Sequence, residues 1–381
     1  MLKKTFSLIS LLVISGLLSA DEPSVYRQIL RKQGDDGVHT FRIPGLAVTP
    51  AGTLLAVFDL RHQSPADLPQ DIDVGILRSL DHGDTWSPVK RILDFDKNEP
   101  GSLGNGVGDP AILVDSQTKT IFVAALWSKG NRAWKGSGPG LSPEETGQLV
   151  LTKSTDDGLS WSPPVNITSE IRGRDPKWRL FFCGPGNGIQ LRNGTLVFAA
   201  QFREPAGPPH SCLLFSGDHG RTWTVSPPAI PEHPPTSEAQ VAELPDGSLL
   251  ITMRDESRSG LRCWARWNWN HSINDDLSAG HWSEPWHVLP DPVCMASLIT
   301  LSDGTLCFSN PNSSTERIGL TIRTSADGGR SWTDGRLLEK GDSMYSSLTL
   351  LQDGRIAVLY ESEGSLKFAR FSPAWLNKNQ P

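Results

Sequence analysis

The sequence is poor in the residues on which several common functions depend. Its 381 residues include five cysteines, with no Cys-x-x-Cys pair, and three tyrosines against 13 tryptophans and 13 phenylalanines. HExxH and EF-hand patterns are absent, which argues against a zinc or calcium site. The Gly-x-Ser-x-Gly motif of common serine hydrolases is also missing, and Asp109 stands where a dinucleotide-binding loop would need its third glycine. We therefore expect neither a metal nor a cofactor.

The five cysteines, at positions 183, 212, 263, 294 and 307, are too sparse and irregularly spaced for a disulfide framework. An oxidising compartment would permit at most two bridges and one free thiol. We favour the alternative in which they are small, buried apolar side chains.

Positive charge is also scarce. Residues 1–20 predict a signal peptide, with Lys3 and Lys4 before an apolar run that ends in Ser19 and Ala20. Removal of these two lysines leaves 34 of the 36 basic residues, compared with 42 acidic residues, so the formal charge falls from -6 to -8. We expect a secreted or periplasmic monomer that binds no nucleic acid. No later run reaches about 18 apolar residues, so we expect no integral membrane segment in the mature chain.

Turn-forming residues are abundant, and they occur in two repeats. A Ser-x-Asp-x-Gly-x-Thr/Ser-Trp motif, the Asp box, is found at 79–86, 154–161, 216–223 and 325–332. A turn followed by a short β-rich run is found at 51–55, 118–123, 193–197, 246–250, 303–306 and 353–357. In most of these turns Asn-Gly or Asp-Gly favours a tight primed hairpin.

The spacing of these repeats predicts the fold. Six copies in the mature chain give roughly 60 residues per unit, near the size of a four-stranded propeller blade with long loops. We therefore predict an all-β protein, a six-bladed β-propeller of four-stranded antiparallel blades, that occupies residues 21–381 as a single domain. The Asp boxes are expected to shape turns, with their Ser, Thr and Trp side chains packed beneath, and to carry no chemistry.

Three arginines stand at the edges of predicted strands in apolar surroundings. Arg42 lies within Phe41-Arg42-Ile43-Pro44, Arg254 ends the run 249–253, and Arg317 precedes the run 318–322. A buried arginine is costly unless it meets an anion or a fixed carboxylate. Taken singly, each could form a surface salt bridge instead. Because they belong to different blades, they can also converge on the propeller axis and bind a carboxylate through bidentate hydrogen bonds.

With these motifs the chain resembles the bacterial exo-α-sialidases, or neuraminidases, of the six-bladed propeller class. The resemblance extends from Tyr26 to about Phe371. It rests on Phe41-Arg42-Ile43-Pro44, the four Asp boxes, Ser237-Glu238-Ala239-Gln240, Arg254, Arg317, Tyr345 and Glu361.

The resemblance implies three catalytic residues. Tyr345 matches the nucleophile, Glu238 the acid paired with it, and Asp67 the general acid and base. Sialic acid carries a carboxylate on its anomeric carbon, so a neutral phenol avoids the repulsion that a carboxylate nucleophile would meet; sialidases are the known tyrosine exception among retaining glycosidases. A phenol is a poor nucleophile at a pKa near 10, so it needs a partner that takes its proton.

The resemblance also implies a substrate-binding set. Arg42, Arg254 and Arg317 match the triad that holds the sialic acid carboxylate, and Glu361 matches the acid that braces Arg42. The remaining matches are to an additional substrate-binding arginine (Arg61), a residue facing the sugar 4-hydroxyl (Asp109) and two residues near the N-acetyl pocket (Trp127 and Trp134). For the two tryptophans, packing within a blade is an equal alternative.

We therefore predict an exo-α-sialidase that acts on sialylated glycoconjugates and hydrolyses their terminal sialic acids with retention. A trans-sialidase would use the same residues and favour a sugar acceptor over water. The other alternative is an inactive sialic-acid-binding propeller. The joint presence of Tyr345, Glu238 and Asp67 disfavours that alternative.

Overall fold

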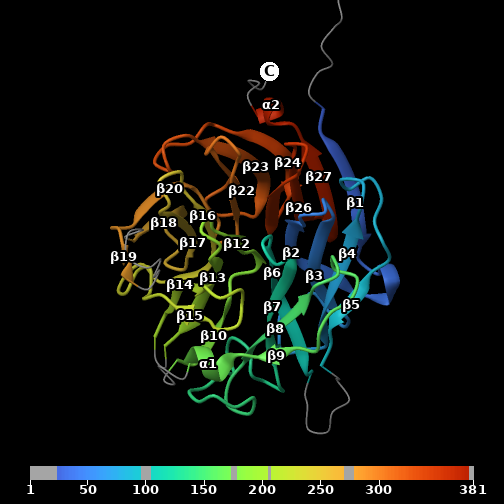
Figure 1. Ribbon diagram of the computed structural model, residues 1–381, viewed down its shortest axis with the longest axis vertical. Helices are drawn as coiled ribbons and strands as arrows, with labels where there is room; N and C mark the ends of the chain where they lie inside the picture. The colour runs from blue at the N-terminus through green and yellow to red at the C-terminus, as the bar shows by residue number, and fades with distance from the viewer. Residues whose placement is uncertain (1–23, 96–103, 173–177, 205–206, 270–278, 377–381) are drawn as a thin grey trace, which may run out of the picture.

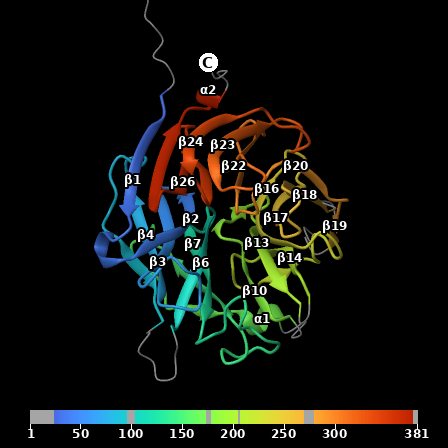
Figure 2. The ribbon, with the colours of Figure 1, turned by 180° about the vertical axis from the view of Figure 1, so that it is seen from behind.

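The computed structural model describes residues 24–95, 104–172, 178–204, 207–269 and 279–376. In these ranges six sheets of four or five strands, antiparallel except for one short parallel pair, form a ring of blades (Figures 1 and 2). The helical elements whose bounds lie within these ranges are short: α1 (Thr168–Arg172), α2 (Pro373–Leu376) and the 3-10 turn η1 (Asp35–Gly37). The prediction of an all-β, six-bladed propeller is confirmed. The predicted signal peptide, residues 1–20, lies outside the described residues.

In blades 1, 2 and 5 the four strands of the blade follow one another along the chain. Blade 1 contains β2 (Thr40–Val48), β3 (Leu54–Arg61), β4 (Ile72–Ser79) and β5 (Lys90–Leu93). Blade 2 contains β6 (Gly106–Asp115), β7 (Thr120–Ser128), β8 (Gln148–Ser154) and β9 (Val165–Asn166). Blade 5 contains β21 (Ser297–Thr300), β22 (Leu306–Pro311), β23 (Ile318–Ser325) and β24 (Arg336–Asp342).

Blades 3 and 4 carry additional short strands. Blade 3 contains β10 (Leu180–Cys183), β12 (Ile189–Gln190), β13 (Leu196–Arg203), β14 (Pro209–Ser216) and β15 (Thr224–Val225). Both β10 and β12 pair with β13, and between them β11 (Gly186–Asn187) pairs in parallel with β6 of blade 2. Blade 4 contains β16 (Thr236–Glu243), β17 (Leu249–Asp255) and β18 (Leu261–Asn268), with β19 (His281–Trp282) and β20 (Trp286–Pro290) sharing the edge of β18.

The last blade closes the ring. It contains β25 (Ser346–Leu350), β26 (Ile356–Ser362), β27 (Ser365–Phe371) and, as its outer strand, β1 (Tyr26–Lys32). β1 pairs antiparallel with β27 from Tyr26 opposite Arg370 to Lys32 opposite Ser365. Figures 1 and 2 show the two strands side by side, in blue and red. Hydrogen bonds between the two ends of the described chain therefore hold the first blade next to the last.

The core lies between the blades. Six buried apolar clusters occupy the six interfaces between neighbouring blades. Successive side chains of a strand point to opposite faces, so Phe122 of β7 packs toward blade 3 while Val123 packs toward blade 1. This explains why the middle strands are apolar on both faces.

The turn-and-strand repeat forms the first hairpin of every blade. Gly52, Gly194, Gly247, Gly304 and Gly354 close five of these turns, with φ between 81° and 96°. In the first, Gly52 N–H donates to Thr49 O and Thr49 N–H to Thr53 O, and the same pattern recurs in the other four. A single left-handed glycine after a type I turn produces this pattern. The predicted hairpins are present, but they are type I turns with a following glycine rather than primed turns.

The Asp boxes connect the third and fourth strands of blades 1, 2, 3 and 5. In the first box Asp81 accepts hydrogen bonds from the Thr85 hydroxyl at 2.6 Å and backbone at 2.9 Å, and these bonds lower the pKa of Asp81 to about 2. The Trp of each box packs against the preceding blade, as Trp86 does on Phe368 and Trp223 on Phe122. The boxes therefore fasten neighbouring blades together.

All five cysteines lie within the described ranges, and each is buried and free. The expectation of small buried thiols is confirmed. In the described part of the chain, no helix is long and apolar enough to cross a membrane.

Candidate active site

A cavity of about 190 Å³ lies where β2, β6 and β16 begin, where β17 ends and just before β25. Antiparallel pairing brings these strand ends to the same end of the propeller. Of the predicted site residues, the cavity is lined by Asp67, Asp109, Trp134, Glu238, Arg254 and Tyr345. Others on its wall include Ile43, Leu126, Phe182, Gln201, Ser237 and Glu256.

Tyr345 and Glu238 form the centre of the cavity wall. The Tyr345 hydroxyl donates to Glu238, with 2.6 Å to Oε1 and 2.7 Å to Oε2. Arg254 Nη1 donates to Glu238 Oε2 at 3.0 Å and to Tyr345 Oη at 3.2 Å. Burial, together with the charge of Glu238, raises the pKa of Tyr345 well above its ordinary value. The phenol is therefore protonated, and a carboxylate already accepts its hydrogen bond.

The other two arginines of the predicted triad approach the ring of the same tyrosine. The guanidinium carbon of Arg42 lies 5.3 Å from the Tyr345 ring centroid, and that of Arg317 lies 5.7 Å away. Arg42 comes from β2 and Arg317 directly precedes β23, so with Arg254 of β17 they represent three blades. The structure thus brings together three cations that are distant in sequence, around one phenol.

Glu361 of β26 contacts both the side chain and the backbone of the β2 segment. Its Oε2 lies 3.2 Å from Arg42 Nε, and its Oε1 accepts the Ile43 N–H at 2.6 Å. Ile43 has φ 62°, a left-handed conformation that strains a β-branched residue. Glu361 therefore contacts Arg42 and also holds a strained backbone.

Asp67 and Arg61 belong to a network of charges on blade 1. Arg61 Nη1 donates to Asp67 Oδ1 at 2.7 Å, and Arg42 Nη1 lies 3.5 Å from the same oxygen. The Asp67 side chain is 76% exposed. Partial burial alone would raise the pKa of Asp67, but Arg61 and Arg42 outweigh it and hold that pKa below its ordinary value. In the free protein Asp67 is therefore ionised.

Asp109 lies at a bulge of β6 with φ 56°. Its N–H donates to Asp59 Oδ1 at 2.9 Å, while Asp59 Oδ2 accepts from Arg61. Burial and the neighbouring charges of Asp59 and Asp67 raise the pKa of Asp109 well above its ordinary value. Its carboxyl group is thus a protonated or readily protonated group on the cavity wall.

The two tryptophans differ in position. Trp134 lines the cavity, edge-on to Phe182 with ring centroids 6.2 Å apart. Trp127 stacks on Phe95 at 4.4 Å and donates its indole N–H to Asn105, and it is not on the cavity wall. For Trp127 the geometry matches the alternative of packing within the fold.

Three residues of the site were not predicted. Asp59 interrupts the apolar run of β3, a signal that was available in the sequence. Glu256 lies 2.9 Å from Arg254 Nε and accepts from Ser237 Oγ at 2.5 Å. Gln201 is buried on the cavity wall, and neither polar atom of its amide has a hydrogen-bond partner in the described residues. A glutamine within a strand carries no sequence signal for such a role.

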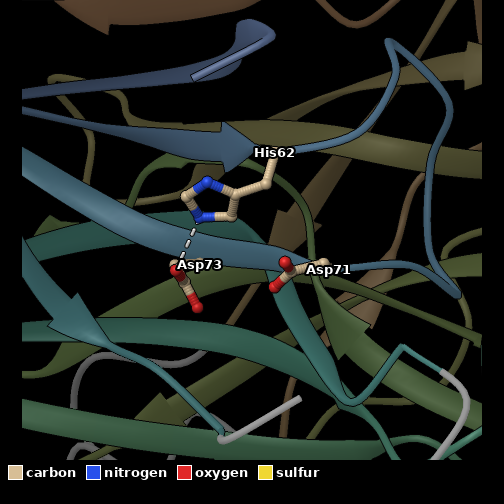
Figure 3. A group of neighbouring side chains, drawn as sticks. All are labelled: His62, Asp71 and Asp73. Atoms are coloured by element: carbon tan, nitrogen blue, oxygen red, sulfur yellow. Dashed lines mark hydrogen bonds and ion pairs between the residues drawn. The ribbon is translucent and has the colours of Figure 1, made fainter. Parts of the chain in front are cut away.

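One group of side chains has the composition of a metal site (Figure 3). Single ligand atoms of His62, Asp71 and Asp73 lie within 4.8 Å of one another. His62 Nε2 lies 2.8 Å from Asp73 Oδ2, and Arg91 Nε lies 2.9 Å from the same oxygen. Asp73 Oδ2 therefore already contacts two nitrogen atoms. The group joins the end of β3 to the start of β4, at the base of the loop that carries Asp67.

The chain matches the family model described as the BNR repeat-like domain over residues 54–358. A sialidase of Bacteroides fragilis is 43% identical over 352 residues, which cover 87% of this chain and 62% of the relative. A sialidase of Micromonospora viridifaciens is 35% identical over 373 residues, covering 93% of this chain and 55% of the relative. The chain thus spans less than two thirds of the length of these curated relatives.

Solved structures show the same fold. A Hadza microbial sialidase superposes with a TM-score of 0.84 at 41% identity, over 92% of this chain and 69% of that one. A leech intramolecular trans-sialidase superposes with a TM-score of 0.73 at 21% identity, over 92% of this chain and 71% of that one. At the latter identity the likeness concerns the fold alone.

Proposed function

Because this chain belongs to the sialidase family and carries its BNR repeat-like domain, we propose that it is an exo-α-sialidase. It hydrolyses terminal sialic acids of glycoproteins, glycolipids or oligosaccharides with retention of configuration. The observation that carries this proposal is the hydrogen bond of Tyr345 to both oxygens of Glu238 among three arginines. We also propose that residues 1–20 direct export of the protein.

Substrate binding begins with the carboxylate of the sugar. Arg42, Arg254 and Arg317 supply three permanent positive charges beside Tyr345, and guanidinium groups bind carboxylates in a bidentate manner. A carboxylate bound at Arg42 competes with Asp67 for this cation. The pKa of Asp67 then rises toward the range in which it can donate a proton. Binding of the correct substrate thereby prepares the general acid.

In the first chemical step the Tyr345 oxygen attacks the anomeric carbon while Glu238 accepts the phenolic proton. Asp67 protonates the glycosidic oxygen, and the aglycone leaves. The three arginines stabilise the oxocarbenium-like transition state by fixing the substrate carboxylate beside it. The product of this step is a sugar covalently attached to Tyr345.

In the second step the roles are reversed. Asp67, now ionised, removes a proton from water, and the water oxygen attacks the anomeric carbon from the side that the aglycone has left. Glu238 returns its proton to the departing Tyr345 oxygen. Two displacements restore the original configuration, and the protein regains its starting protonation state.

The decisive experiment follows the products from α2,3-sialyllactose by ¹H NMR. We expect α-configured free sialic acid to appear first and the β anomer to follow by mutarotation. A sialylated acceptor or an anhydro sugar as the main product would assign transfer rather than hydrolysis. Binding without turnover would assign a lectin, and the absence of both would contradict the family assignment of function.

A further inference from the structure

A buried ion pair lies next to the loop that joins blade 4 to blade 5. Arg262 of β18 is 0% exposed, and its Nη1 lies 3.3 Å from Oδ2 of Asp291, which is 2% exposed. Arg262 Nε also donates to Thr252 Oγ1 at 2.8 Å. Two charges removed from water are expensive, and an apolar pair of similar volume often serves stability as well or better. The pair therefore calls for an explanation other than stability.

The pair holds the backbone of the loop on both sides of Val293. Asp291 Oδ1 accepts the Cys294 N–H at 3.1 Å, and Arg262 Nη1 donates to the Cys294 carbonyl at 2.5 Å. The Asp291 N–H donates to Gly260 O at 3.0 Å. Arg262, at the start of β18, thus holds the Cys294 carbonyl, and the Asp291 carboxylate holds the Cys294 N–H. The Asp291 N–H is held by the turn before β18.

Val293, between these tied residues, has φ 57°. The left-handed conformation is unfavourable for a β-branched residue, so it persists because its neighbours impose it. The Val293 carbonyl accepts a hydrogen bond from Arg317 Nη2 at 2.9 Å. In the described residues this is the hydrogen bond that orients the Arg317 guanidinium, which lies 5.7 Å from the Tyr345 ring centroid.

We propose that Arg262 and Asp291 are positioning residues, which act through the strained Val293 carbonyl to aim Arg317 at the substrate carboxylate. The identity of that carboxylate as sialic acid rests on the proposed function. The pair itself touches no substrate, because neither residue lies on the cavity wall.

A double-mutant cycle tests this route. We expect R262M to raise KM for α2,3-sialyllactose about tenfold while kcat changes less than about threefold, the signature of lost binding rather than lost chemistry. R317M is expected to raise KM at least as much. R262M/R317M should be no worse than R317M, because Arg262 acts only through Arg317. Additive effects, or an unchanged KM in R262M, would overturn the proposal.

Two controls separate positioning from stability. The double variant R262M/D291L removes both charges, and we expect a urea midpoint close to that of the wild type but a KM as high as in R262M. Arg370 is a matched control, because it also contacts one carboxylate, that of Asp84 at 2.6 Å, and one carbonyl, that of His82 at 2.7 Å. R370M should lower the midpoint and leave KM unchanged. A KM that follows the urea midpoint across these variants would contradict positioning.

A crystal structure of R262M/D291L provides a readout that does not depend on activity. We expect Val293 to leave the left-handed region and its carbonyl to lose Arg317. An unchanged bond between Val293 and Arg317 would refute the route even if KM had risen. If the wild type released no sialic acid, the proposed function would fail, but this structure would still decide the positioning proposal.

Discussion

The Tyr345 hydroxyl lies 2.6 and 2.7 Å from the two carboxylate oxygens of Glu238, although 107 residues separate the two in the chain. Tyr345 directly precedes β25, the inner strand of the last blade, and Glu238 lies near the start of β16, the inner strand of blade 4. In the proposed mechanism neither group would react alone, since the phenol is protonated and the carboxylate would be repelled by an anionic sugar. The proposal is that their contact provides a nucleophile that is neutral before attack.

The first prediction concerns this pair. Tyr345→Phe should lower kcat about 10³-fold or more, with KM little changed, and Glu238→Gln should lower it by about 10²-fold or more. The double variant should be no slower than Tyr345→Phe, because the two residues act as one unit. Initial rates of sialic acid release provide the measurement.

A matched tyrosine provides the control for that prediction. Tyr360 is also buried and donates to a glutamate, Glu339, at 3.4 Å, but it does not line the cavity. Tyr360→Phe should leave kcat and KM unchanged. Equal losses in Tyr360→Phe and Tyr345→Phe would mean that the effect is structural and would refute the nucleophile assignment.

The second prediction concerns Asp67 as the acid for the leaving group. Asp67→Ala should lower kcat/KM about 10³-fold for α2,3-sialyllactose but only about tenfold for an activated aryl sialoside, because a good leaving group departs without protonation. The two substrates, compared at one pH, are sufficient for the test. Equal losses for both would show that Asp67 serves binding, through Arg61 and Arg42, and not proton transfer.

The third prediction separates the two contacts of Glu361. Glu361→Ala removes the partner of Arg42 and leaves the Ile43 N–H unsatisfied, so the free energy of unfolding should fall by about 3–5 kcal/mol. Glu361→Gln retains an acceptor for the Ile43 N–H, so for this variant the free energy of unfolding should fall by only about 1–2 kcal/mol. Urea denaturation measures both, and both variants should raise KM because Arg42 is less firmly held. Equal destabilisation by the two variants would argue that the backbone bond is unimportant.

The fourth prediction is a stability change that depends on pH. The pKa of Asp109 is raised in the folded protein, so the folded state retains a proton that the unfolded state loses above its ordinary value near 4. The contribution of Asp109 to the stability should therefore fall as pH rises through this window. Asp109→Asn removes this pH dependence. The free energy of unfolding of the variant, relative to that of the wild type, should therefore rise from pH 4 to pH 8, by about 1.4 kcal/mol per unit of pKa shift.

Urea denaturation at several pH values checks that prediction, and an advantage independent of pH would contradict it. Asp303, an exposed turn aspartate whose carboxylate accepts from Thr305 and whose pKa is lowered, is the control. Asp303→Asn should show the opposite trend in a lower pH window: relative to the wild type it should lose stability as pH rises from the lowered pKa of folded Asp303 to the ordinary value near 4, with no further change up to pH 8.

The architecture was predictable because it depends on short local patterns. A glycine that tolerates positive φ closes five of the six first hairpins, and Ser-x-Asp-x-Gly-x-Thr/Ser-Trp closes four of the third ones through hydrogen bonds within the box. These contacts involve residues within five positions of one another. Counting them was therefore enough to obtain six blades, although the turn type and the extra strands of blades 3 and 4 were not obtained.

The site was predictable only in part, and by resemblance more than by physics. Arg42, Arg254 and Arg317 had a local signal, a charge at the edge of an apolar strand. Asp59 had the same signal, but its bond to the Asp109 amide depends on the packing of β3 against β6, which no spacing along the chain encodes. Trp127 and Trp134 have equivalent sequence signals, and the packing of blade 2 places one in the fold and the other on the cavity wall.

The sequence alone determined the repeat and the number of blades. It also limited the candidate nucleophiles to three, because the chain has only three tyrosines. The choice among those tyrosines depends on the closed ring. Tyr26 and Tyr360 lie within outer and middle strands, whereas Tyr345 alone reaches the cavity. Its contacts with Glu238, Arg42 and Arg317 join segments up to about 300 residues apart, and they form because β1 pairs with β27 and holds the first blade beside the last. Such long-range contacts are set by the topology as a whole, since their loop-closure entropy is offset only by the packing of all six interfaces.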